Sequence, residues 1–393
     1  MKNRLLLILA ASTMLVSCGA NESNSSANST DSNYATSSSS SFSFSEQSIS
    51  SSQYGSEVTG FIAKQRAISA LKKATEATLS ADALKVSSSQ GKFKTDLKGS
   101  EIPLEYNDEE GNKISKKVSG SLYLNTANLS LSVSAENLSE KDASKINAYG
   151  EVSGDMEMKA TGEVADELTT SSAKSGSGTF SGNASAKAYL SSDWAYADIS
   201  GVNSWLTNNG YKELTNTKFK ANITDTKEYI DSLNEESSSS SEDSSASSSF
   251  DFSGSNIIRI IGVMSSEQHV YKLDSETQEV VYTLDYSLIK SELDLVGYSN
   301  ETLKNIADNL PSKDDVKLEE STVYFVFKES GLVSSGINFK GEILESNPSY
   351  YGSLEAVHAL SYTYDKDSLD IKDPGDTSSF KDVTPKKEDS TGE

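Results

Sequence analysis

A period-two alternation of apolar and polar residues constrains this chain more than any other feature. It is clearest over residues 113–124 and 127–138, on either side of an expected turn at Asn125 and Thr126. The apolar residues of both segments then share one face: Leu122, Leu124, Leu129, Leu131 and Val133. Because successive side chains of a strand point to opposite faces, such segments bury one face of a sheet and leave the other polar.

Similar segments follow along most of the chain, and about a dozen strands are expected. They cover residues 85–97, 146–164, 178–199, 269–273, 278–286, 316–328, 336–344 and 354–364. Helical spacing predicts an amphipathic helix at 58–79 and short helices at 224–233, 287–296 and 300–310. Residues 257–263 fit either a helix or a strand. This pattern predicts an α+β fold with one large curved antiparallel sheet, half-barrel-like, an N-terminal helix and several short helices on one face.

Serine-rich and charged segments divide the chain. Residues 18–56 are too poor in apolar side chains to offset the entropy of ordering, and we expect a disordered tether. A serine-rich insert at about 235–253 interrupts the predicted domain at 57–370, and residues 371–393 are expected to form a disordered polar tail. The insert leaves open whether the structured part is one domain or two.

The N-terminus has the pattern of a secretion signal. Lys2 and Arg4 precede an apolar stretch of residues 5–16, which is too short to span a bilayer, and residues 1–17 are predicted to be a signal peptide. The stretch ends in Leu15, Val16, Ser17, Cys18 and Gly19, which resembles the bacterial lipobox. The resemblance implies that Cys18, the only Cys of the chain, is lipidated and becomes the mature N-terminus. We therefore expect an extracytoplasmic protein anchored to the bacterial cell membrane through Cys18.

Charge and rare residues argue against several function classes. The chain has 35 Lys and Arg against 58 Asp and Glu, a formal net charge of −23, which disfavours nucleic acid as a partner. A single Cys excludes an intramolecular disulfide. His269 and His358 both lie in strand-like sequence, and no Ser has the Gly-x-Ser-x-Gly surroundings of a nucleophile elbow. We expect no catalytic residues, no metal and no cofactor, and predict that the protein is not an enzyme.

The leading helix, the strand count and the aromatic strand at 193–198 resemble the half-barrel lipoproteins of the LolA/LolB-like superfamily and the mycobacterial LppX/LprG group. The resemblance implies binding of a lipid or other hydrophobic ligand in a cavity, by a protein that we expect to be a monomer. Seven aromatic residues are candidates to line it: Trp194, Tyr196, Trp205, Tyr324, Phe325, Phe327 and Phe339. The alternative is a structural or adhesive surface lipoprotein with a solid core and protein or wall-polymer partners; a wall-acting hydrolase is a third option.

Overall fold

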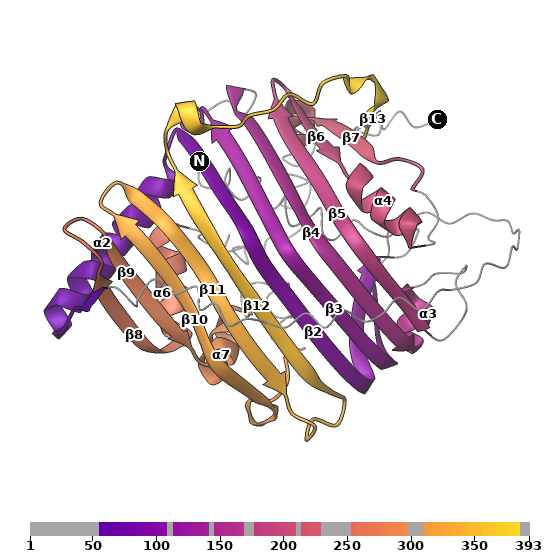
Figure 1. Cartoon of the computed structure of the whole chain (residues 1–393), viewed down its shortest axis with the longest axis horizontal. Coiled ribbons are helices and arrows are strands. Elements are labelled where there is room, and N and C mark those ends of the chain that lie inside the picture. The colour runs from indigo at the N-terminus through magenta and orange to yellow at the C-terminus, as the bar shows by residue number, and fades with distance from the viewer. Residues whose placement is uncertain are drawn as a thin grey trace, which may run out of the picture.

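The computed structural model describes residues 55–107, 113–140, 145–168, 177–209, 214–228, 253–297, 308 and 310–385. Within these ranges, thirteen strands form one sheet in the order β1-β8-β9-β10-β11-β12-β2-β3-β4-β5-β6-β7-β13 (Figure 1). All neighbours are antiparallel except β7 and β13, which are parallel. The predicted α+β class with a large curved antiparallel sheet is confirmed.

The strands vary from two to 25 residues. They are β1 (Ser56–Glu57), β2 (Ala83–Asn107), β3 (Lys113–Glu136), β4 (Asn147–Gly162), β5 (Ser177–Ser191), β6 (Trp194–Asp198), β7 (Lys218–Asn222), β8 (Ser265–Lys272), β9 (Gln278–Leu284), β10 (Val316–Lys328), β11 (Gly331–Ile343), β12 (Tyr350–Thr363) and β13 (Lys381–Asp382). The helices with stated bounds are α2 (Phe61–Leu79), α3 (Glu163–Leu168), α4 (Ser200–Asn208), α6 (Gly254–Val263) and α7 (Tyr286–Gly297), and residues 223–228 are also helical. Residues 257–263, which fitted either a helix or a strand, belong to α6.

The sheet is continuous across the two sides of the serine-rich insert. β12 pairs with β11 on one edge and with β2 on the other, so strands from both ends of the chain lie side by side. The insert falls between β7 and α6, and its residues up to 252 lie outside the described residues. The described strands of both halves therefore belong to one sheet.

The turn expected at Asn125 and Thr126 is wrong, because both residues pair with β4 inside a continuous β3. Instead, a β-bulge in β3 changes which residues of the alternating apolar and polar pattern point to a given face. The register of β3 against β4 shifts between Ala127 and Ser130, and Asn128 has a φ of 53°. One extra residue reverses the parity of a strand, which puts the apolar side chains before and after the bulge on the same face.

The two faces of the sheet differ. α2 and α6 pass behind β8–β11 in Figure 1, and their packing against that part of the sheet forms the largest described core, with Leu71, Ile258 and Phe327 buried. Gly254 allows α6 to approach α2, since a Cβ there would lie 2.8 Å from Cγ2 of Thr75. We call this side the helix face and the opposite side the open face.

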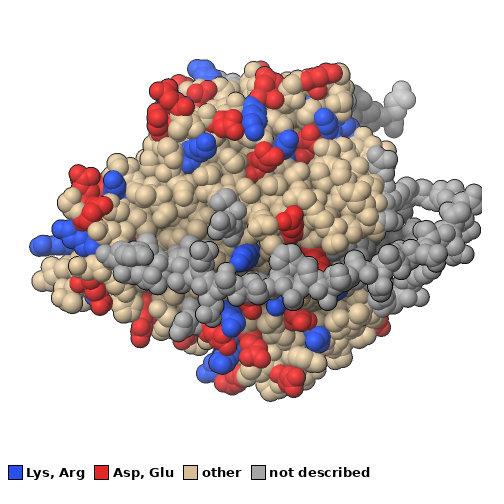
Figure 2. Space-filling view, viewed as in Figure 1, with Lys and Arg blue, Asp and Glu red and all other residues tan. Residues whose placement is uncertain are grey.

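A smaller core at the lower end of the sheet packs α3 onto the same helix face, around Ile102, Val118 and Val164. The open face, which Figures 1 and 2 show, carries polar rows such as Lys94, Asn125 and Glu157 on β2, β3 and β4. In Figure 2 its charged residues gather mainly towards the upper and lower ends of the strands.

Candidate ligand-binding surface

The central part of the helix face is an apolar band that crosses five adjacent strands, β11, β12, β2, β3 and β4. The pairing register places these side chains on one face, and all are partly buried rather than fully enclosed. The members of the apolar band are Phe93, Leu122, Leu124, Leu129, Leu131, Met156, Met158, Ile337 and Phe339. At one side, Met156 and Met158 pack against Trp205 of α4, and at the other the band approaches the α2 core. A surface of this kind suits an elongated apolar ligand.

A polar pair interrupts the apolar band. Oγ of Ser88 on β2 lies 2.5 Å from Nε2 of His358 on β12, a hydrogen-bond distance. His358 pairs with Ile337 and Ser88 pairs with Leu131, so both side chains belong to the helix face. Both residues are partly buried. Burial lowers the pKa of His358 below its ordinary value, because the charged imidazolium loses hydration there.

Register shifts between β12 and β2, between β2 and β3, and between β3 and β4 fall near this pair. The β12–β2 register shifts between Val357 and Ser361, and the β2–β3 register shifts around Gly91. A Cβ at Gly91 would come within 2.7 Å of Cδ2 of His358, so the absence of a side chain at Gly91 makes room for the imidazole. The bulge at Asn128 lies in β3, the next strand of the sheet, on its pairing with β4. Such bulges re-aim side chains and are frequent beside functional sites.

The seven aromatic candidates do not line one cavity. Phe325 and Phe327 are buried in the core under α2, Trp205 is buried beside Met156, and Phe339 belongs to the apolar band. These four share the helix face. The other three lie on the open face: Trp194, Tyr196 and Tyr324.

The open face carries a strap formed by residues 365–385. These residues run along the upper end of the strands from β2 to β7, where β13 pairs with β7 (Figure 1). The sequence predicted a disordered tail from 371, but Phe380 is only 6% exposed and packs edge-to-face on Tyr196 at 5.3 Å. Residues 386–393 lie outside the described residues. The strap is ordered although its composition is polar, because the Phe380 ring is buried against the open face.

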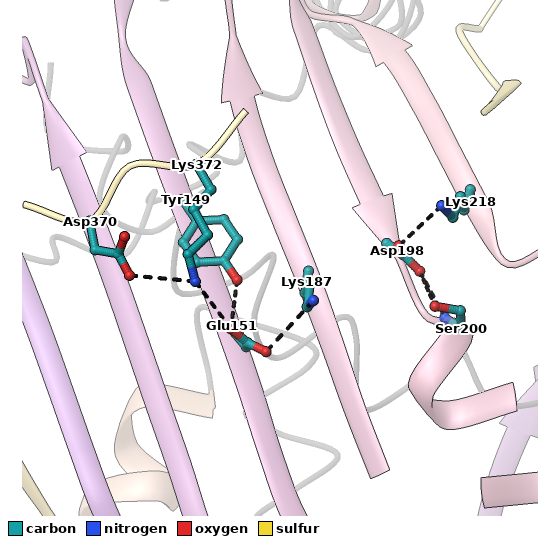
Figure 3. A network of polar contacts seen from close by, with 8 residues as sticks. All are labelled: Tyr149, Glu151, Lys187, Asp198, Ser200, Lys218, Asp370 and Lys372. Carbon is teal, nitrogen blue, oxygen red and sulfur yellow. Dashed lines mark hydrogen bonds and ion pairs between the residues drawn. The ribbon is translucent and has the colours of Figure 1, made fainter. Parts of the chain in front are cut away.

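A polar network fastens the middle of the strap (Figure 3). Nζ of Lys372 lies 4.7 Å from the ring centroid of Tyr149 and 3.9 Å from Glu151. The hydroxyl of Tyr149 donates to Glu151 at 2.6 Å. Burial, together with the adjacent Glu151, raises the pKa of Tyr149. The tyrosine therefore stays protonated as a donor over the physiological pH range.

Two further sets of polar contacts lie near the two ends of the strap. Lys366 lies 2.8 Å from Asp82 and, with the hydroxyl of Ser139, lowers the pKa of Asp82 to about 2. Asp198, at the end of β6, accepts from the hydroxyl of Ser200 at 2.6 Å and lies 3.6 Å from Lys218. Burial pushes the pKa of Asp198 upward, but these contacts outweigh it and the pKa is lowered.

A polar hollow of about 760 Å³ lies at the other end of the strands. Its wall includes Lys98, Gly99, Tyr350 and Tyr351. Gly120 in the same wall has a φ of 141°, and a Cβ there would collide with the carbonyl of Thr161, so the backbone requires glycine. The hollow is open and polar, and it differs from the cavity that the sequence predicted for an apolar ligand.

The predicted lipidation site and signal-peptidase residues, Leu15 to Gly19, lie outside the described residues, as do the signal peptide and most of the tether. Over the described part of the chain, no helix is long and apolar enough to cross a membrane. The described side chains also contain no group of three or more His, Cys, Asp or Glu placed to hold a metal ion.

Comparison with known protein families, curated proteins and solved structures finds no match to this chain.

Sequence reasoning missed the pairing of Ser88 with His358. His358 stood out as one of two histidines, and its place among apolar residues was visible. Its partner is 270 positions away, and only the β12–β2 register brings the two together.

Proposed function

We propose that this protein is a membrane-anchored, extracytoplasmic lipoprotein that binds a lipid or other hydrophobic ligand along the apolar band, without acting as an enzyme. The observation that carries the proposal is the band itself. Its leucines, methionines and phenylalanines lie on β11, β2, β3 and β4. The described helices pack around this band: α2 and α6 against β8–β11, α4 beside the two methionines, and α3 at the lower end of the sheet. Burying such a surface against an acyl chain is favourable by about 25 cal/mol per Å².

The anchor follows from the sequence around Cys18. A diacylglycerol on this thiol would supply two acyl chains, which is enough for stable attachment where one chain is marginal. The tether of residues 18–56 would give a random-coil reach on the order of 30–36 Å. The folded domain can then stand clear of the headgroups or descend to them.

The start of α2 supports a position close to the membrane. Phe61 and Ile62 are 78% and 68% exposed, and they lie within six residues of the end of the tether. Lys64 and Arg66 follow within the next turn. Exposed apolar residues beside basic ones are typical of helices that lie in a membrane interface. We propose that this end of α2 faces the lipid surface.

Native mass spectrometry tests the ligand. Residues 19–393, which include every described residue, are purified without detergent and sprayed with and without organic solvent. We expect an adduct of lipid mass that Leu124→Ser weakens, because Leu124 lies in the apolar band. Asn125→Ser, the next residue on the open face, should retain it. A clean mass for the unliganded chain would refute the ligand and favour the structural or adhesive alternative.

Membrane fractionation tests the anchor. Cys18→Ala removes the thiol that the lipid needs, so the variant should leave the membrane fraction and lose the mass of a diacylglycerol. Ser17→Ala keeps a small residue beside the cut and serves as the control. A Cys18→Ala variant that stays in the membrane fraction would show that the lipidation proposal is wrong.

A further inference from the structure

We propose that Ser88 and His358 form the head-group site of the apolar band, and that the ligand is an amphiphile with an uncharged polar head. This inference rests on the proposed function and narrows it to a class of ligand. The two side chains form a hydrogen-bonded pair at the centre of the band, with Ile337 and Leu131 as their cross-strand neighbours. A wholly apolar ligand would gain nothing from a polar pair at that place.

The chemistry of the pair suits a hydroxyl or ester head. A serine hydroxyl has one donor and two acceptor sites, and a neutral imidazole has one donor and one acceptor nitrogen. Their mutual hydrogen bond uses one donor and one acceptor. The remaining capacity can receive a hydroxyl or a carbonyl oxygen of a ligand, which matches the head of an acylglycerol.

No described helix-face side chain in the rows around the pair carries a charge, and this disfavours an ionic head. Among the described helix-face side chains of the neighbouring rows, none is Lys, Arg, Asp or Glu: Ser335, Ile337, Ala356, Leu360, Val86, Phe93, Thr126, Leu129, Leu131 and Val152. A phosphate or carboxylate placed there would lose its hydration without gaining a cation. The basic residues of β2 on either side of the pair, Lys85, Lys92 and Lys94, belong to the open face.

The glycine at position 91 fits this role. With no Cβ, it lets the imidazole lie against β2, because a Cβ there would come within 2.7 Å of Cδ2 of His358. The bulged register on both sides of β2 also directs Ser88 and His358 towards each other across β2 and β12. The sheet thus presents two polar groups within an otherwise apolar row.

Fluorescence binding tests the inference on residues 19–393. The probes are a pyrene-labelled monoacylglycerol, a phosphatidic acid with the same labelled chain, and a pyrene-labelled alkane, each below its aggregation limit. We expect the monoacylglycerol to bind most tightly. Ser88→Ala should weaken it about 3- to 10-fold, the range for one lost hydrogen bond, and leave the alkane unchanged. Ser87→Ala, on the open face beside it, should change neither.

A second variant guards against misfolding. His358→Gln keeps a donor and an acceptor, so it should retain more monoacylglycerol binding than His358→Leu, with matching circular dichroism spectra for both. If the wild type binds no probe, the proposed function itself fails. If it binds the alkane and the monoacylglycerol equally, or prefers the phosphatidic acid, the head-group site is refuted and the hydrophobic site stands.

Discussion

Gly91 is the residue that most directly determines how closely β2 and the His358 ring can approach. A Cβ there would meet the His358 ring at 2.7 Å and the Leu129 Cβ at 3.0 Å. Gly91→Ala must therefore displace the imidazole or widen the strands, and we expect a loss of about 1–3 kcal/mol in the free energy of unfolding. Urea titration measures it.

Gly154 on β4, two strands away from β2, provides a matched control. A Cβ there would meet only ordinary contacts at 3.5 Å. Gly154→Ala should leave stability within about 0.5 kcal/mol of the wild type or raise it slightly, since alanine restricts the unfolded chain. Equal losses at both positions would show that the His358 contact is not the cause.

His358 should make stability depend on pH in a defined direction. Burial holds its folded-state pKa below the unfolded value of about 6.5. Between these two values the unfolded chain binds more protons, so stability falls as the pH falls through that window. His358→Gln should lose less stability than the wild type between pH 7.5 and pH 5. An identical pH dependence in the two proteins would contradict the burial of a neutral imidazole.

The contribution of the strap to the stability of β6 and β7 can be measured with a single substitution in the strap. Phe380 packs on Tyr196, and Nζ of Lys218 lies 5.5 Å from its ring centroid. Phe380→Ala should release β13 and accelerate amide exchange in β6 and β7, with a stability loss of about 2–4 kcal/mol. Val383→Ala, at a 47% exposed position of the same strap, should have little effect. Unchanged exchange in β6 and β7 would show that the strap does not protect them.

At the scale of secondary-structure elements, the sequence predicted strands and helices well where the spacing of apolar residues was regular. The β5–β6 and β8–β9 hairpins, α2 and α7 all appear where alternation or helical spacing placed them. The Asn125–Thr126 turn was wrong because a turn and a one-residue bulge produce the same parity change in a sequence. The strap was missed because the aromatic ring that fastens it packs on a tyrosine from a distant strand.

The site was predicted less completely than the fold. A list of aromatic residues could not separate the helix face from the open face, because the face of each strand is fixed by its register and by bulges. Trp194 and Phe339 illustrate this, since both looked suitable for a cavity and yet they lie on opposite faces. The Ser88–His358 pair required the same long-range information.

On the scale of the whole molecule, the sheet unites the two halves of the chain. β12 pairs with β2, β1 pairs with β8, and α6 packs on α2. Each of these contacts joins a segment before the serine-rich insert to one after it. Antiparallel pairing and helix packing of this extent do not require a covalent link between the segments.

Cleavage within the insert tests that unity. A protease site in place of residues 237–241 should yield two fragments that stay together through size-exclusion chromatography, with unchanged circular dichroism and one cooperative unfolding transition. Dissociation after addition of urea should coincide with that transition, because neither fragment can bury its share of the α2 core or pair the exposed edges of β2 and β12 alone. Fragments that separate in buffer and keep folded spectra would mean that two domains, rather than one sheet, govern stability.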